Sequence, residues 1–192
     1  MKKFILFLGV ISIVLLLLSG GYCSAQDTAV YYARCNLKVI KGNHITWINW
    51  QSTPTYIPVG EKIRIVDRGK NIVKIETIEN GKEYTLDIGN YGDIFLEKFI
   101  TGEKVDISKF PEEVQKNIRN LVARVDMTKE QVYIAMGPPT KVVDGKTNRM
   151  TYEDIIDHDL WVYARRRFGK NIGVAFDPKT GLVTRTEGIW GK

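Results

Sequence analysis

The sequence predicts an α+β protein in which a β-rich first half precedes a second half built from two helices and three strands. Three observations support this fold class. Short alternating apolar runs fill residues 35–100, two segments with helical spacing follow up to residue 136, and strand-like runs separated by turn residues occupy residues 160–187. The predicted parts are an export signal at 1–25, a β-rich domain at 26–104 and an α+β domain at 105–192.

The β-rich domain is expected to form a small barrel. Alternating runs at 63–66, 73–78 and 84–88 form a meander, and earlier runs lie at 37–39 and 45–48. Asn80-Gly81 separates two of these runs, and such a pair supports the positive φ angles of a tight type I′ hairpin. Closure of several short strands into a barrel would leave no exposed edge.

The first helix of the second half is expected within residues 105–123. Pro111 stands where a first helical residue would, and the acidic residues after it suit the positive end of the helix dipole. Apolar residues then recur at helical spacing, so one face should be buried. These residues are Phe110, Val114, Ile118, Leu121 and Val122.

A second helix is expected from Thr128 to Met136. Thr128 is a suitable N-cap and Gln131 completes a capping box, whereas Gly137 and Pro138 end the helix. A three-stranded antiparallel meander follows at 160–168, 172–176 and 182–187. One layer of two helices would cover the apolar face of this meander.

Both halves resemble known families. The second resembles the BamE-like (SmpA/OmlA) family of the outer-membrane assembly machinery over about residues 112–187. The matching motifs are Met127-Thr128, Gln131-Val132, Gly137-Pro138-Pro139, Trp161-Val162-Tyr163 and Phe176-Asp177-Pro178-Lys179-Thr180-Gly181. Asp126 stands where that family commonly has glycine. This resemblance implies an ααβββ fold, whereas the first half is similar to an SH3-like barrel through residues 58–65.

The N-terminus predicts export. Lys2 and Lys3 precede an uncharged apolar stretch at 4–18, and Cys23-Ser24-Ala25 offers small residues for a signal peptidase. A retained membrane anchor is one alternative. Lipidation of Cys23 is another, although Gly20 and Tyr22 do not match the usual residues before a lipidated cysteine.

The charge excludes one class of partner. Removal of residues 1–25 leaves 26 basic and 22 acidic residues, a net charge of +4. This mild excess favours an anionic membrane or cell wall weakly, and it is too small for nucleic-acid binding. Cys35 would be the single remaining cysteine, so no internal disulfide is expected.

The sequence is poor in catalytic signals. Cys35 and His44 could pair across neighbouring strands, but a buried thiol and an exposed histidine are favoured. A solvated acidic loop is favoured over a cation site for the group before the aromatic strand, because it lacks zinc or EF-hand spacing. This group is Asp154, Asp157, His158 and Asp159. No catalytic residue, metal or cofactor is therefore predicted.

Two clusters are candidate binding sites. Arg165, Arg166, Arg167 and Lys170 are expected either to contact anionic headgroups or an acidic partner, or to form a solvated hairpin edge. Trp47, Trp50 and Tyr56 surround the 51–55 loop and are expected either to line a groove for peptides or glycans, or to pack in the core.

The expected function is therefore that of a non-catalytic cell-envelope adaptor or structural protein. It would lie in the periplasm or on the periplasmic face of the outer membrane and bind envelope proteins, with outer-membrane assembly components as candidates. The alternative is a secreted or periplasmic binding or inhibitory module for a peptide, a glycan or an enzyme.

Overall fold

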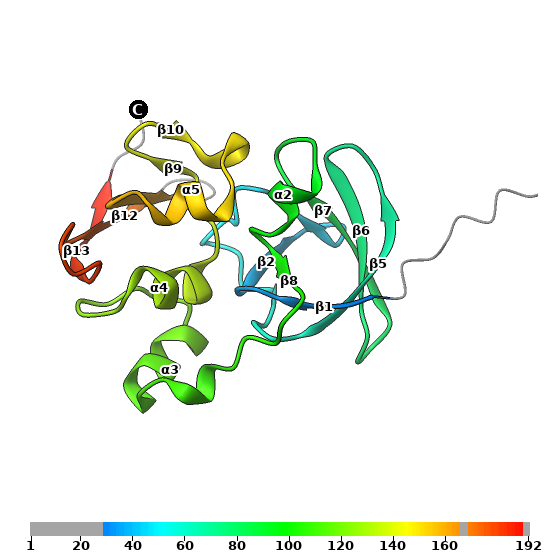
Figure 1. Ribbon diagram of the computed structural model, residues 1–192, viewed down its shortest axis with the longest axis horizontal. Coiled ribbons are helices and arrows are strands. Elements are labelled where there is room, and N and C mark those ends of the chain that lie inside the picture. The colour runs from blue at the N-terminus through cyan, green and yellow to red at the C-terminus, as the bar shows by residue number, and fades with distance from the viewer. Residues whose placement is uncertain (1–28, 166–168, 190–192) are drawn as a thin grey trace, which may run out of the picture.

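The computed structural model describes residues 29–165 and 169–189 and shows a mixed α/β fold with few helices and large curled sheets (Figure 1). The candidate export signal at 1–25, with Cys23, lies outside the described residues, as do Arg166 and Arg167.

The first half forms one eight-stranded sheet in the order β4-β2-β3-β7-β6-β5-β1-β8. Its strands are β1 Val30–Ala33, β2 Leu37–Ile40, β3 His44–Ile45, β4 Tyr56–Ile57, β5 Lys62–Arg68, β6 Ile72–Thr77, β7 Lys82–Asp87 and β8 Ile100–Thr101. A short helix, α2 Asp93–Leu96, precedes β8. The sheet curls into a half-barrel whose end strands are β4 and β8, so the expected closed barrel is wrong (Figure 1).

Two local expectations in the first half are corrected. The Asn80-Gly81 pair does lie in a hairpin, but Thr77 pairs with Lys82, so four residues form the loop and only Gly81 has a positive φ, of 65°. The Asn80 carboxamide oxygen instead accepts hydrogen bonds from the Thr77 hydroxyl and the Lys82 amide, at 2.7 and 3.0 Å. The predicted strand at 45–48 is short because a turn follows Ile45, closed by the Asn49 amide on the Thr46 carbonyl at 3.1 Å.

The second half forms a five-stranded sheet in the order β10-β9-β11-β12-β13. Its strands are β9 Lys141–Val142, β10 Gly145–Lys146, β11 Leu160–Tyr163, β12 Asn171–Phe176 and β13 Val183–Ile189. The β11-β12-β13 part is the predicted antiparallel meander, although β11 ends at Tyr163. The helical elements are η1 Ile107–Lys109, α3 Glu112–Arg119, α4 Lys129–Met136, η2 Thr147–Arg149 and α5 Tyr152–Ile156.

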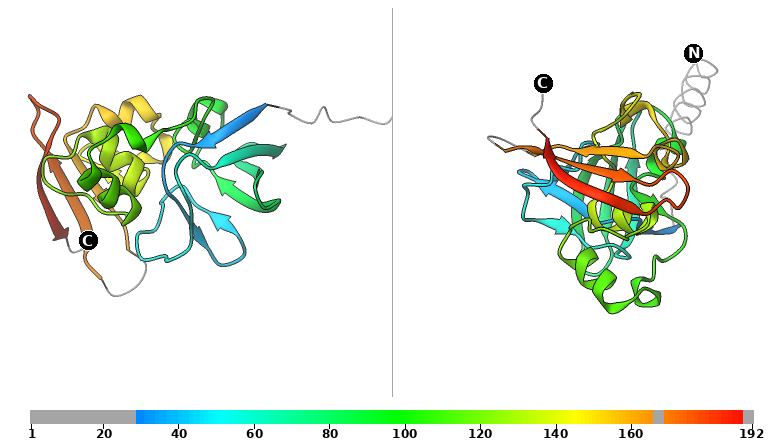
Figure 2. Two further views of the ribbon diagram at one scale, coloured as in Figure 1. Left: turned by 90° about the horizontal axis from the view of Figure 1, so that it is seen from below. Right: turned by 90° about the vertical axis from the view of Figure 1, so that its left-hand side faces the viewer.

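The helices of the second half lie between its sheet and the half-barrel (Figure 2, left). As predicted, Ile118 of α3 is buried, and Thr128 and Gln131 form a capping box at the start of α4. Pro111 occupies the N-cap of α3 rather than its first turn. Helix α5 was not predicted, and its own capping box is made by Thr151 and Asp154.

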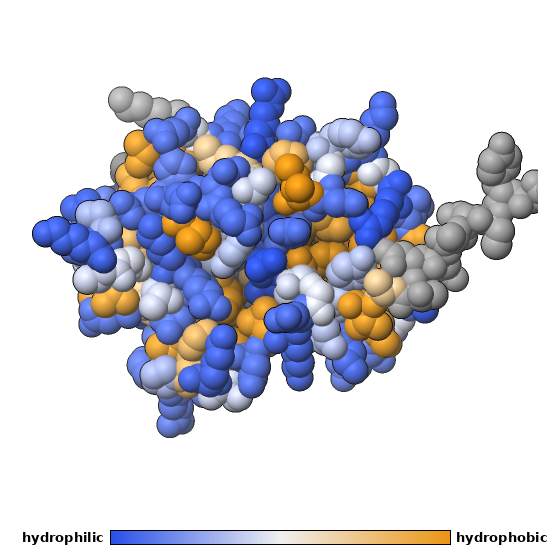
Figure 3. All heavy atoms as spheres, viewed as in Figure 1, coloured by the Kyte–Doolittle hydropathy of each residue, from blue (hydrophilic) through white to orange (hydrophobic). Residues whose placement is uncertain are grey.

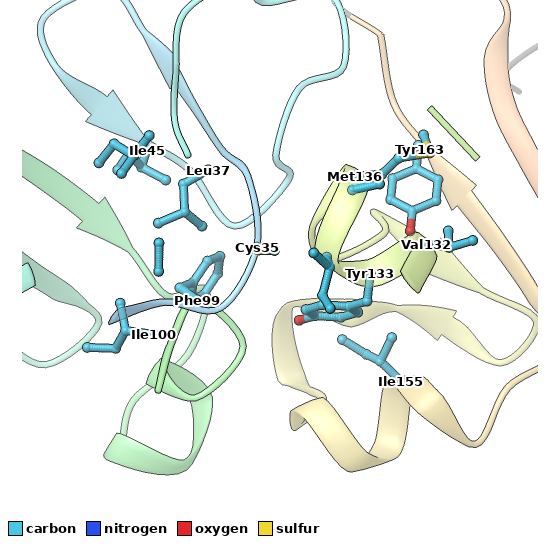
Figure 4. Close-up of a cluster of buried hydrophobic side chains, with 14 of the residues drawn as sticks. Cys35, Leu37, Ile45, Phe99, Ile100, Val132, Tyr133, Met136, Ile155 and Tyr163 are labelled. Carbon is cyan, nitrogen blue, oxygen red and sulfur yellow. The ribbon is translucent and has the colours of Figure 1, made fainter. Parts of the chain in front are cut away.

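One continuous cluster of buried residues runs through both halves. In Figure 4, Cys35 and Phe99 from the first half face Tyr133 of α4, and Tyr163 lies beyond that helix. Trp161 of β11 is fully buried, and its ring packs edge-on against Phe176 with centroids 4.7 Å apart. By contrast, the surface seen in Figure 3 is mostly hydrophilic and carries only small separate hydrophobic patches.

The junction between the halves is built around the C-terminal end of α4. The last four carbonyls of a helix lack partners within the helix. Here the amides of Gly137 and Asn36 reach the carbonyls of Tyr133 and Ile134, at 2.7 and 3.0 Å. The Asn36 side chain donates to the Ala135 carbonyl at 3.1 Å.

The last carbonyl of α4, at Met136, accepts from the side chains of Asn49 and Gln51, at 2.6 and 2.9 Å. Three of the four carbonyls are therefore bonded by residues of the first half, and the remaining one by Gly137. The first half thus completes the end of a helix that belongs to the second half.

Gly137 permits this close approach. Its φ of 73° and ψ of −165° suit glycine alone. A Cβ atom at this position would lie 2.1 Å from Asn49 Nδ2 and 3.3 Å from Cys35 Sγ. The abrupt corner at 137–139 therefore allows the polar side chains of the first half to reach the helix end.

Candidate functional site

Cys35 and His44 lie in different environments. Cys35 is completely buried and its Sγ lies 3.9 Å from the Lys98 carbonyl oxygen, whereas His44 is exposed on β3. Burial raises the pKa of the Cys35 thiol to about 12, with a smaller opposing effect from Arg34. A thiol with this pKa is protonated at neutral pH and is a poor nucleophile.

The acidic group near α5 is divided among separate structural roles. Asp154 caps α5, Asp159 forms an ion pair with Lys129 at 2.8 Å, and His158 Nδ1 lies 3.5 Å from an Asp144 carboxylate oxygen. Asp157 is exposed at the C-terminal end of α5. Within residues 29–165 and 169–189, no three His, Cys, Asp or Glu side chains are arranged to hold a metal ion.

Lys98 is a buried cation at the junction. Its side chain is enclosed at 1% exposure, its Nζ donates to the Thr147 carbonyl at 3.1 Å, and the Phe95 and Phe99 rings flank it. Burial lowers the pKa of Lys98 to about 8, and Asp87 and Asp154 oppose this effect. Because the amine is enclosed, we assign it to the structure of the junction and not to a binding site.

Trp47, Trp50 and Tyr56 do not line the open hollow beside their loop. Trp47 packs against the core, and the Tyr56 ring lies 5.5 Å from the Lys38 Nζ. The nearby loop at 52–55 does line an open hollow of about 740 Å³, together with residues 39–43 and Lys82. The hollow therefore has a mixed lining of polar, basic and aliphatic residues without an aromatic one.

A second hollow, of about 500 Å³, involves the predicted cationic cluster. Arg165 and Lys170 line it, whereas Arg166 and Arg167 lie outside the described residues. We call it the β13 groove. Its walls come from the segment after α3, from the end of α4 and from the adjoining ends of β12 and β13. The full lining is Leu121, Val122, Ala123, Arg124, Met136, Arg165, Lys170, Asn171, Ile172, Thr186, Glu187 and Gly188.

The β13 groove combines an apolar lining with basic side chains. Met136 is buried, and Leu121, Val122 and Ile172 are half-buried, so each offers some apolar surface. Arg124, Arg165 and Lys170 are exposed. The acidic residue of the lining, Glu187, lies 3.5 Å from Arg185, and this contact offsets its charge.

The two arginines of the groove are available to a partner. Neither Arg124 nor Arg165 forms an ion pair with any described residue. The Arg165 amide donates to the Asn171 carboxamide oxygen at 3.3 Å, which ties the end of β11 to the start of β12. Guanidinium groups held beside apolar surface suit carboxylates of a ligand.

The chain path opens this groove. Residues 126–128 run along the outer edge of β13, where the Asp126 and Val183 amides donate to the carbonyls of Val183 and Met127 at 3.0 and 2.8 Å. The segment then diverges from the strand, and Asp126 and Leu121 adopt positive φ angles of 70° and 57°. The edge of β13 beyond this point borders the groove. Figure 2 (right) shows β13 at the edge of its sheet nearest α3.

The sequence predicted part of the β13 groove. The run of arginines pointed to Arg165 and Lys170, but Arg124 was missed because it stands alone in the sequence. Leu121 and Val122 were assigned to the buried face of α3, yet the helix ends at Arg119 and both residues line the groove. The break after Arg119 is marked only by Asn120, which occupies the C-cap and is a weaker stop signal than glycine or proline.

Within the described part of the chain, no helix is long and apolar enough to span a membrane. Comparisons with family models, with curated proteins and with solved structures return no match.

Proposed function

We propose that this chain is a non-catalytic, exported adaptor of the cell envelope that binds an acidic segment of a partner protein in the β13 groove. The observation that carries the proposal is the groove, where Arg124 and Arg165 lie beside apolar surface without carboxylate partners in the described chain. Such a surface suits a ligand with both apolar and acidic side chains.

Export and envelope location form part of the same proposal. They rest on Lys2 and Lys3, the apolar stretch at 4–18 and the small residues at 23–25. The proposed relationship of the second half to BamE-like domains is supported by the order α3, α4, β11, β12, β13, in which β9, β10, η2 and α5 lie between α4 and β11. The proposed SH3-like relationship of the first half is supported by its short curled strands.

A photocrosslinking experiment in the native cells tests this function. A photoreactive benzoylphenylalanine at Val122, in the groove, is compared with the same probe at Val143, which is 67% exposed between β9 and β10. We expect a specific protein adduct from the Val122 position only. The combined Arg124→Ser and Arg165→Ser changes should reduce its yield, and the identified protein should carry an acidic segment.

Three results would contradict the proposal. They are equal adducts from both positions, adducts with lipid alone, and cell fractionation that leaves the protein in the cytoplasm. An adduct whose yield does not respond to removal of Arg124 and Arg165 would reject the electrostatic part of the recognition.

The hollow beside the 52–55 loop supports a second candidate function, a binding module for an anionic peptide or glycan. Lys41 and Lys82 line this hollow, and its volume of about 740 Å³ is sufficient for such a fragment. Titration with soluble peptidoglycan fragments, with tryptophan fluorescence as the readout, tests it. A response that Lys41→Ser and Lys82→Ser abolish supports this role, and no response rejects it.

A further inference from the structure

The outer edge of β13 has unused backbone groups beside the groove. The Phe176 amide donates to Asp159 on the β11 side, and the Asp177 amide donates to Leu182 on the β13 side. Successive residues of a strand direct their backbone groups to alternate sides. Residues 171, 173 and 175 therefore bond to β13, where their register partners are Ile189, Glu187 and Arg185.

This alternation places the backbone groups of Thr186 and Gly188 on the outer side of β13. In the described chain, β13 is the end strand of its sheet, and only residues 126–128 pair along its outer edge, at Leu182 and Val183. Thr186 and Gly188 both line the β13 groove. The groove therefore contains a strand edge that can accept further pairing.

We propose that the ligand of the β13 groove is an extended, acidic–apolar segment of a partner protein that adds to β13 as a sixth strand. Its backbone pairs with Thr186 and Gly188, and it runs antiparallel to β13, as residues 126–128 do. This inference rests on the proposed function and names the binding mode of the same site. Strand addition supplies main-chain hydrogen bonds, and alternate side chains provide specificity.

Charge and shape identify this occupant. Successive side chains of an added strand would face opposite sides of the sheet. One set would meet the apolar surface of Leu121, Val122 and Ile172, while acidic residues would pair with Arg124 and Arg165. A second copy of β13 fits less well, because its Arg185 and Glu187 offset each other and it would bring no net negative charge to a basic site.

Amide hydrogen exchange of the full chain measures the pairing directly. The probe is the blocked peptide acetyl-Glu-Val-Glu-Val-Glu-Val-Glu-amide, and a lysine-for-glutamate version is the charge control. We expect saturation with the acidic peptide to slow exchange of the Thr186 and Gly188 amides at least about tenfold. The Arg185 and Glu187 amides, which already bond to β12, should change little, and the lysine peptide should have no effect.

Two N-methylated peptides test the direction of the hydrogen bonds. One carries N-methyl groups on every valine and the other on every glutamate. Because alternate residues of a strand direct their N–H groups to opposite edges, each peptide loses the N–H donors of one edge only. Strand addition predicts that one of these peptides loses at least about tenfold in affinity while the other binds nearly as well as the parent. Equal affinities for the two peptides would reject strand addition.

Thr186→Pro provides the test from the protein side. It removes an N–H that points away from β12, and proline is tolerated on such an edge. Circular dichroism should therefore show a folded variant that binds the acidic peptide at least about tenfold more weakly. Glu187→Pro is the matched control, because it removes an inward N–H and should destabilise the sheet.

The remaining outcomes separate this inference from the proposed function. If the Val122 crosslink forms but the Thr186 and Gly188 amides stay unprotected when the identified segment is bound, the adaptor function stands and strand addition is wrong. No binding of the acidic peptide at millimolar concentration also rejects the inference. Binding to phosphatidylglycerol vesicles that the combined Arg124→Ser and Arg165→Ser changes abolish, without protection of the Thr186 and Gly188 amides by the acidic peptide, would reject strand addition and identify the groove as a lipid contact instead.

Discussion

The junction and the β13 groove differ in whether their backbone polar groups have hydrogen-bond partners. At the junction, the last four carbonyls of α4 all have partners, and Asn36 and Asn49 are at most 2% exposed. At the β13 groove, the outer groups of Thr186 and Gly188 face a hollow. Buried polar groups are costly without partners, whereas groups at a hollow are solvated until a ligand arrives.

Met136 shows how closely the two regions adjoin. Its carbonyl is bonded by Asn49 and Gln51 at the junction, and the residue also lines the β13 groove. Polar residues of the junction therefore contribute to stability, whereas those of the β13 groove are available for binding. Substitutions that leave polar groups of the junction without partners should therefore lower the free energy of unfolding, whereas substitutions of exposed groove residues should change binding with little effect on stability.

Gly137→Ala should have the largest effect on stability. The added Cβ would lie 2.1 Å from Asn49 Nδ2, and the backbone conformation is unfavourable for alanine. We expect a loss of about 4 kcal/mol in the free energy of unfolding. Urea denaturation measures it. Gly102→Ala is the control, because its Cβ would meet nothing within 4 Å, and equal losses for the two variants would contradict the described corner.

Asn36→Ala should have the next largest effect. It removes donors to the Ile118 and Ala135 carbonyls, at 2.9 and 3.1 Å, and the acceptor of the Val59 amide at 3.0 Å. Leaving these groups without partners should cost about 3 kcal/mol. Thermal and urea unfolding measure this loss. The exposed Asn71→Ala should stay within about 0.5 kcal/mol of wild type, and a similarly small effect for Asn36→Ala would show that the junction is hydrated.

Lys98→Met should change how stability depends on pH. The folded-state pKa of Lys98 is about 8 and its ordinary value is 10.5, so the unfolded chain binds more protons between these values. Lys98 should therefore contribute a rise of about 1 kcal/mol to the free energy of unfolding of the wild type from pH 8 to pH 9. The raised pKa of Cys35 partly offsets this rise, because the unfolded thiol, with an ordinary pKa of 9.0, already loses its proton between pH 8 and pH 9.

Urea denaturation at pH 7, 8 and 9 measures this dependence, with pH values chosen on either side of the Lys98 pKa of about 8. Lys98→Met should lose the rise and be as stable as wild type or more so at pH 7, since an enclosed ammonium is exchanged for an apolar side chain. Lys116→Met, on the exposed side of α3, should keep the rise. An unchanged slope in Lys98→Met would show that another group is responsible.

The combined Arg124→Ser and Arg165→Ser variant should have the smallest effect on stability. Both side chains are exposed and form no ion pair with a described residue. We expect a change within about 1 kcal/mol in urea denaturation, together with weaker binding of the acidic peptide at low salt. A large loss of stability would show that the groove is a structural element, like the junction.

Local chemistry explains which elements were predictable. Thr128 and Gln131 cap α4 through hydrogen bonds spanning three residues, so the sequence contains the whole signal. The same kind of box at Thr151 and Asp154 was present but was interpreted as part of an acidic loop. Asp126 has a positive φ of 70°, a conformation that Asp and Asn adopt more readily than most other non-glycine residues.

The interactions between distant residues were not predictable from the sequence. Asn36 reaches Ala135 across 99 positions, and neither residue has a pattern that marks the pair. Lys98 resembles any surface lysine in the sequence, yet the fold encloses it. The β13 groove likewise combines Arg124 with Arg165, which only the path of the chain brings to one hollow.

The alternation of strands, the capped helices and the glycine corner are specified by the sequence, because they depend on backbone preferences and on neighbours within a few positions. Three other features depend on the tertiary fold: the half-barrel is open, its asparagines complete α4, and in the described chain part of the β13 edge has no pairing strand beside a basic groove. These features arise from packing between distant segments, where the burial of apolar surface and the pairing of buried polar groups select one arrangement.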